Sequence, residues 1–142
     1  MTVPAPRHAD GYVSSREFAG PWIPTPCSVQ RRQISDWTQS HGWRLGRIFE
    51  EPASACSGGA TALEHALARV ESRESGGVVV TRLHRVAATL DEALEAIARI
   101  QAAGGTFVSV RDGIDLSTAS GRLILRVLLS VVRWDYAHSS PR

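Results

Sequence analysis

Short apolar segments of the strand type alternate with amphipathic helical segments along almost the whole chain. Val78–Val80 form a continuous β-branched run, which is typical of a central parallel strand covered on both faces. Thr89 and Glu92 then stand at capping-box spacing, before apolar residues that recur at helical intervals from Leu90 to Ile100. Because strand and helix segments alternate in this way, the sequence predicts a three-layer α/β fold: an open, mostly parallel sheet with helices on both faces.

Glycine pairs mark the ends of two helical patterns, at Gly76-Gly77 and Gly104-Gly105. A helix is expected after each strand, and the last one begins near Thr118. The expected strands are 11–15, 43–49, 77–81 and 106–110. Residues 1–10 carry two prolines and few apolar side chains. The sequence therefore predicts a flexible N-terminal arm at 1–10, a single domain over 11–136 and a short tail at 137–142.

Composition narrows the class of protein. Hydrophobic residues make up 43% and charged residues 21% of the 142 residues, which is typical of a globular chain. No apolar run reaches the roughly 20 residues of a membrane span, and the start lacks the apolar core of a signal peptide. We therefore expect a cytoplasmic protein without membrane contact.

The net charge excludes no class of protein, and the cysteine content does not indicate a bound metal. The net charge is +2, and all 16 basic residues are arginine. This mild basic bias does not by itself indicate a nucleic-acid-binding protein. Cys27 and Cys56 lie far apart and outside any CxxC pattern, so neither a disulfide framework nor a zinc site follows from them. We expect no metal and no cofactor.

The last helical segment is more apolar than a helix on one sheet requires. Nine of the twelve residues from Leu123 to Trp134 are apolar. A helix that packs on one sheet needs an apolar stripe over about a third of its circumference. The excess predicts either a helix buried unusually deeply in its own domain or, as we favour, one that packs on a second subunit. The expected interface residues are Leu123, Val127, Leu128, Val131 and Trp134.

Several local motifs, in their order and spacing, resemble the catalytic domain of the resolvase/invertase family of serine recombinases, from about Gly11 to Asp135. The matching segments are Gly11-Tyr12-Val13, Gln30 to Trp43, Val78 to Arg85, Gly104 to Val110 and Ile114 to Leu123. The resemblance implies the resolvase-type α/β fold. It also implies a reaction in which a serine hydroxyl attacks a DNA phosphodiester while surrounding arginines stabilise the developing charge.

The reactive positions implied by this resemblance are largely substituted. The family pattern Tyr-x-Arg-x-Ser reads Tyr12-Val13-Ser14-Ser15-Arg16 here, so Ser14 replaces the arginine and Arg16 replaces the nucleophile. Residues two apart on a strand are displaced by about 6.5 Å, and Ser15 points to the opposite face. Ser14 cannot take over the attack unless the phosphate moves.

Further substitutions affect the family's other reactive positions. His84 stands for an aspartate, while Arg85 is retained. Two further arginines are replaced by Ala60 and Ala88, and an acidic position late in the last helix falls on Arg133. Loss of one preorganised donor commonly costs about 100- to 1,000-fold in rate. We therefore expect this domain to be non-catalytic.

The resemblance also implies partners. The chain ends soon after Trp134, where relatives usually continue into a helix-turn-helix domain, so we expect at most weak and non-specific DNA binding by this chain alone. The leading hypothesis is a modulator of DNA recombination. It would act as a homodimer or as a heterodimer with a full-length serine recombinase.

Two alternatives stay open. The chain could cleave DNA with Ser14 or Ser15 as a displaced nucleophile. It could instead bind an anion or another small ligand through Arg16, Arg82 and Arg85, since open parallel sheets often bind ligands beyond a strand end.

The four tryptophans could stack nucleic-acid bases. Core packing is favoured for Trp22, Trp37 and Trp43, and Trp134 is kept as a contact candidate.

Overall fold

The computed structural model describes residues 7–15, 25–51, 61–87 and 89–138. Five strands form one sheet in the order β2-β1-β3-β4-β5. The first four strands in this order run parallel, and β5 pairs antiparallel with β4. The strands are β1 (Arg7–Ser14), β2 (Trp43–Glu51), β3 (Gly77–Val80), β4 (Thr106–Ser109) and β5 (Ile114–Asp115).

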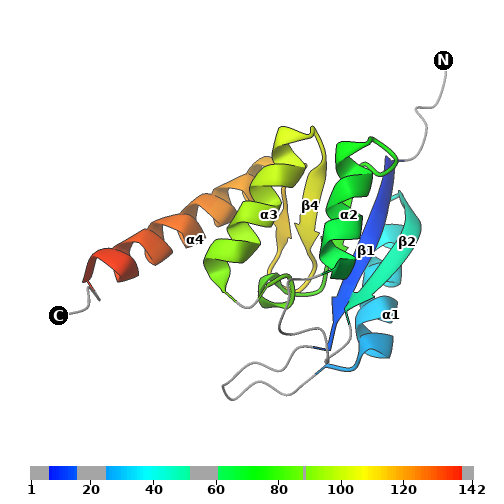
Figure 1. The fold of residues 1–142 in the computed structure, drawn as a ribbon, viewed down its shortest axis with the longest axis horizontal. Helices are drawn as coiled ribbons and strands as arrows, with labels where there is room; N and C mark the ends of the chain where they lie inside the picture. Colours follow the sequence, from blue (N-terminus) through cyan, green and yellow to red (C-terminus); the bar gives the residue numbers. More distant parts are fainter. Residues whose placement is uncertain (1–6, 16–24, 52–60, 88, 139–142) are drawn as a thin grey trace.

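Helices cover both faces of this sheet, as the alternation predicts (Figure 1). Helix α1 packs on one face, and α2 and α3 pack on the other, with the start of α4 against β5. A short 3₁₀ helix, η2 (Leu83–Arg85), follows β3. The longer helices are α1 (Cys27–Ser40), α2 (Thr61–Glu71), α3 (Leu90–Ala102) and α4 (Ala119–His138). The fold is the three-layer α/β fold that the sequence predicts.

Alternation along the strands separates the apolar core into two halves. On one face, Ile34 of α1 packs with Val79 and Val108. On the other face, Tyr12 and Phe107 pack with α2, α3 and the start of α4. All four residues of β3 are buried, so its valine run is a central strand, as predicted.

Two details differ from the sequence expectation. Strand β1 begins at Arg7, inside the segment expected to be a flexible arm, because Arg7 pairs with Trp43 of β2. Its guanidinium also lies 5.5 Å from the centroid of the Trp43 ring. Strand β5 was not expected. It turns the chain back so that α4 starts beside β5, and Gly121 leaves room there for the Asp115 carbonyl.

Within the described residues, no helix is both long enough and apolar enough to cross a membrane.

Candidate functional site

Ser14 lies at the carboxyl end of β1, and a buried glutamine holds its backbone. The Ser14 N–H donates to Oε1 of Gln30 at 3.1 Å, and Nε2 of Gln30 donates to the Ser14 carbonyl at 2.8 Å. The same Nε2 donates to the carbonyl of Thr25 at 2.8 Å. Gln30 therefore ties the end of β1 to α1 and to the chain just before α1, and Ser14 itself is fully buried.

Tyr12, the retained tyrosine, is buried and forms a hydrogen bond within the domain. Its hydroxyl donates to Oε2 of Glu51 at 3.3 Å. The same oxygen accepts the backbone N–H groups of Ala62 and Leu63, in the first turn of α2, at 3.0 and 3.4 Å. A carboxylate here satisfies N–H groups that a helix start leaves without partners and interacts favourably with the helix dipole. Glu51 was not among the site residues predicted from the sequence.

Ser15 faces α1, on the side of the sheet opposite to Tyr12, as the alternation predicts. Its Oγ lies 3.2 Å from Sγ of Cys27, the first residue of α1. Its N–H donates to the carbonyl of Glu51 at 3.2 Å. The two serines of the reactive stretch are therefore held by different neighbours and do not form one reactive pair.

Arg85 is the retained arginine, and it lies under the surface near Ser14. The side chain is 5% exposed, and Nη1 lies 3.4 Å from the Ser14 carbonyl oxygen. Burial lowers the pKa of Arg85 and the charge of Arg82 lowers it further, whereas Cys27 acts in the opposite direction. The structure thus brings Arg85 and the backbone of Ser14 together.

Asp112 organises the turn that carries Arg82 and His84. Its Oδ2 accepts the Leu83 N–H at 2.7 Å and the Ser109 hydroxyl at 2.6 Å, and its Oδ1 lies 3.8 Å from Nη1 of Arg82. Arg82 is therefore drawn toward β4, whereas Arg85 points to β1. Among the described residues, the two arginines therefore contact different groups. Asp112 was also not among the site residues predicted from the sequence.

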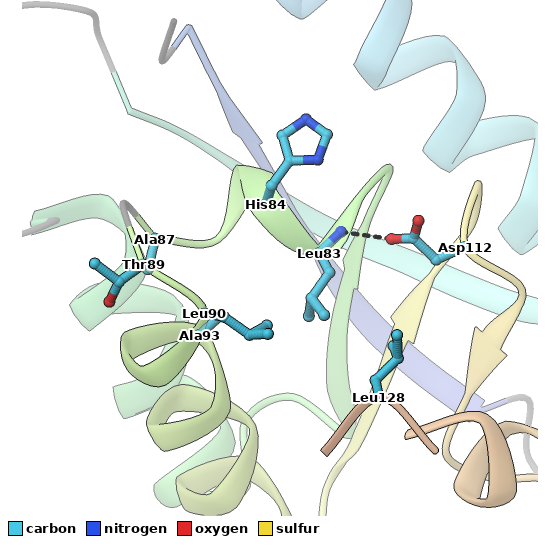
Figure 2. Close-up of a pocket in the computed structure, with 8 residues that line it drawn as sticks. All are labelled: Leu83, His84, Ala87, Thr89, Leu90, Ala93, Asp112 and Leu128. Atoms are coloured by element: carbon cyan, nitrogen blue, oxygen red, sulfur yellow. Dashed lines mark hydrogen bonds between the residues drawn. The ribbon is translucent and has the colours of Figure 1, made fainter. Parts of the chain in front are cut away.

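His84 borders a cavity of about 310 Å³ between η2, α3 and α4. Figure 2 shows Leu83 and Leu128 pointing toward one another across it, with Leu90 and Ala93 of α3 on another wall. Burial lowers the pKa of His84, and the positive charge of Arg85 adds to the effect, although Asp112 opposes it. One turn thus contributes His84 to this cavity and Arg85 to the neighbourhood of Ser14.

The expected interface residues of α4 divide into two groups. Leu123, Val127 and Val131 are 60%, 55% and 52% exposed, and at intervals of four residues they form one stripe, which we call the α4 stripe. Leu128, by contrast, is half-buried against the core and lines the cavity beside η2. The side chain of Trp134 lies outside the described residues.

Some predicted site residues lie outside the described part of the chain. These are Arg16, Ala60 and Ala88, together with the side chain of Arg133. Among the described residues, no cluster of His, Cys, Asp or Glu could hold a metal ion.

A family model supplies the decisive comparison. The model of the resolvase N-terminal domain matches residues 13–140. The chain belongs to the resolvase family. Its fold is correspondingly that of serine recombinase catalytic domains, as the motifs predicted.

Solved structures agree on the fold. The catalytic domain of TP901-1 integrase is similar with a TM-score of 0.73 and 17% identity, over 90% of this chain and 97% of that one. A resolvase family site-specific recombinase from Streptococcus pneumoniae gives 0.66 and 17%, over 92% and 89%. The catalytic domain of ISC1926 TnpA, an IS607-like serine recombinase, gives 0.60 and 15%, over 87% and 80%. No curated protein matches the chain.

Proposed function

We propose that this resolvase-family domain does not cleave DNA and acts by pairing through α4, with a second copy of itself or with a full-length serine recombinase. Pairing would let it modulate recombination, because recombinases of this family that enter such pairs would carry one inactive subunit. The α4 stripe carries the proposal.

The α4 stripe supports pairing because it exposes large side chains that its own domain leaves uncovered. Leu125 on the same helix is 7% exposed and packs in the core, so α4 needs only one of its faces to dock. Figure 1 shows the rest of α4 projecting away from the sheet and its covering helices. Contiguous exposed apolar surface of this kind is typical of protein–protein contact sites.

The site around Ser14 supports the absence of cleavage. An attacking serine needs a hydroxyl presented to the phosphate and several donors placed for the charge that develops. Ser14 is instead fully buried with its backbone clamped by Gln30, and Arg82 is drawn toward Asp112. The tyrosine hydroxyl is engaged by Glu51, which binds the start of α2.

The test of pairing uses Val127→Arg, with Ala98→Arg as the matched control on α3. Val127 lies in the α4 stripe, whereas Ala98 is an exposed residue of a different helix. Light scattering after gel filtration should show a dimer for the wild type and for Ala98→Arg, and a monomer for Val127→Arg. Circular dichroism checks that all three are folded.

Pairing with a full-length serine recombinase is tested by mixing the purified proteins after nuclease treatment. Co-elution that Val127→Arg abolishes and Ala98→Arg preserves would identify the hetero-pair. A wild-type chain that stays monomeric and also fails to bind such a recombinase would contradict the proposal.

The absence of cleavage is tested separately with supercoiled plasmid carrying genomic DNA from the source cells. We expect no covalent protein–DNA adduct from the wild type. An adduct that disappears in Ser14→Ala or in Ser15→Ala would overturn the non-catalytic part and would identify the displaced nucleophile. It would leave the pairing result unaffected.

A further inference from the structure

The edge of the sheet opposite to Ser14 carries a second cavity. Parallel strands all begin at one edge, and β5, which runs antiparallel, ends at that same edge. Residues far apart in the chain meet there around a space of about 410 Å³, which falls in the size range of small-ligand pockets. Arg7 and His8 start β1, Trp43 starts β2, Thr106 starts β4, and Ser117 follows β5.

Glycines keep this space open. Gly76, Gly104 and Gly105 line the cavity where the chain enters β3 and β4. Gly104 has a φ of +81°, and a Cβ built on it would meet no atom within 4 Å. The turn before β4 therefore adopts a backbone conformation that favours glycine and presents no side chain there.

Arg7 supplies the charge of this cavity among its described lining residues. Arg7 and His8 line it, and none of the described residues along it carries a carboxylate. Arg7 is exposed, so its guanidinium is available to an anion from solution. A guanidinium is well suited to a phosphate because it presents several N–H donors in one plane.

An aromatic ring lies beside this charge. The Arg7 guanidinium lies 5.5 Å from the centroid of the Trp43 ring, so the cavity wall combines a cation with an aromatic ring. Trp43 also belongs to a run of rings, since its centroid is 6.3 Å from that of Trp37, which stacks on His41 at 4.2 Å. Aromatic rings beside basic groups are typical of sites that stack a nucleic-acid base and bind its phosphate.

The wall of the cavity holds one more polar group that needs a partner. The Thr106 hydroxyl is buried, and among the described residues it has no hydrogen-bond partner. Buried hydroxyls without a partner are uncommon in folded proteins, and a ligand oxygen or an ordered water reached by side-chain rotation would satisfy this one.

We propose that the cavity at the amino edge of the sheet binds a nucleotide, with the base stacked on Trp43 and the phosphate held by Arg7. The source is either a free nucleoside monophosphate or the phosphorylated end of a DNA strand. The site is separate from the surroundings of Ser14 and from the α4 stripe, so its test does not depend on whether the protein pairs through α4.

The test is calorimetric titration of the full chain with deoxyadenosine monophosphate. Arg7→Gln should raise Kd about tenfold, which is the usual effect of losing a hydrogen bond to a charged group. Arg32→Gln is the matched control, because Arg32 is also an exposed arginine but does not line the cavity. Trp43→Leu should raise Kd by about tenfold as well, through loss of stacking.

Partial probes separate the two halves of the ligand. Deoxyadenosine and inorganic phosphate should each bind more weakly than the nucleotide. A 5′-phosphorylated tetranucleotide that binds more tightly than the mononucleotide would identify a strand end as the source, and the reverse order would identify the free nucleotide.

Three outcomes would overturn the proposal: no saturable heat at millimolar nucleotide, equal affinities for Arg7→Gln and Arg32→Gln, or amide NMR shifts that fall around Arg82 and Arg85 instead of Arg7 and Trp43. Because Arg7 is exposed, its variant decides the question even where Trp43→Leu fails to fold.

Discussion

The carboxyl edge of the sheet and helix α4 differ in how their side chains are satisfied. At the edge, Ser14, Tyr12 and Glu51 are buried and hydrogen-bonded within the domain. On α4, Leu123 and Val127 are large apolar side chains left more than half exposed. We call the carboxyl edge closed, because its polar groups find their partners within the same chain. We call α4 open, because its exposed apolar side chains are available to a second chain.

This difference bears on where function resides. A reaction site must hold polar groups ready for a ligand, and burying those groups against one another removes that readiness. An exposed apolar surface, in contrast, gains free energy when a partner covers it. The described residues that the resemblance predicted as reactive include Tyr12 and Ser14 of the closed region, whereas the proposed pairing belongs to the open one.

The largest expected difference in stability is between substitutions of two leucines of α4, one buried and one exposed. Leu125→Ala should lower the free energy of unfolding by about 3 kcal/mol, because it empties a buried position in the core. Leu123→Ala should change the stability of the monomer by less than about 0.5 kcal/mol, because Leu123 is 60% exposed. Urea unfolding under monomeric conditions measures both. Equal losses would show that α4 is docked along both faces.

Glu51 tests how firmly the carboxyl edge is closed. Glu51→Ala removes the acceptor of the Tyr12 hydroxyl and of two N–H groups of α2, and it should destabilise the domain by about 2 kcal/mol. Glu50→Ala is the matched control, since the neighbouring carboxylate is 44% exposed and pairs with the exposed Arg31. Thermal unfolding compares them. A loss from Glu50→Ala as large as that from Glu51→Ala would contradict the assignment.

Much of this fold is readable from sequence because its signals are local. The valine run of β3 and the capping spacing of α3 both act within a few residues. The Thr89 side chain does accept the Glu92 N–H, at 3.2 Å, as the capping box predicts. The start of β1 was missed because its segment is polar, although Asp10 is fully buried there in an ion pair with Arg69 at 2.6 Å. Strand β5 has two residues, too few for a periodic pattern.

The site was less predictable because its contacts are distant in sequence. Motif spacing located Ser14, His84 and Arg85. Nothing local links Glu51 to Tyr12, which is 39 residues away, or Asp112 to Leu83, which is 29 residues away. A carboxylate that completes a helix start or a turn from such a distance becomes visible only when the chain is folded.

A variant of Gln30 tests the second set of contacts at the carboxyl edge, which are the hydrogen bonds between Gln30 and the backbone of Ser14. Gln30→Ala leaves the N–H and the carbonyl of Ser14 without their side-chain partners in a buried place, at a cost of about 1.5 kcal/mol. Gln39→Ala, at an exposed position of the same helix, should cost less than about 0.5 kcal/mol. Urea unfolding gives both values. Amide hydrogen exchange at Ser14 adds a local readout, and unchanged protection in Gln30→Ala would show that the clamp contributes nothing.

The smallest expected effect concerns His84, which links the two regions through the cavity beside Leu128. Burial and the charge of Arg85 lower the pKa of His84 below its usual 6.5, so the unfolded chain takes up this proton at a higher pH than the folded one. Stability should therefore fall as pH drops below about 6.5 and level off once the folded histidine is also protonated. His84→Gln should flatten that part of the profile. The same slope in wild type and His84→Gln would place the pH sensitivity in another group.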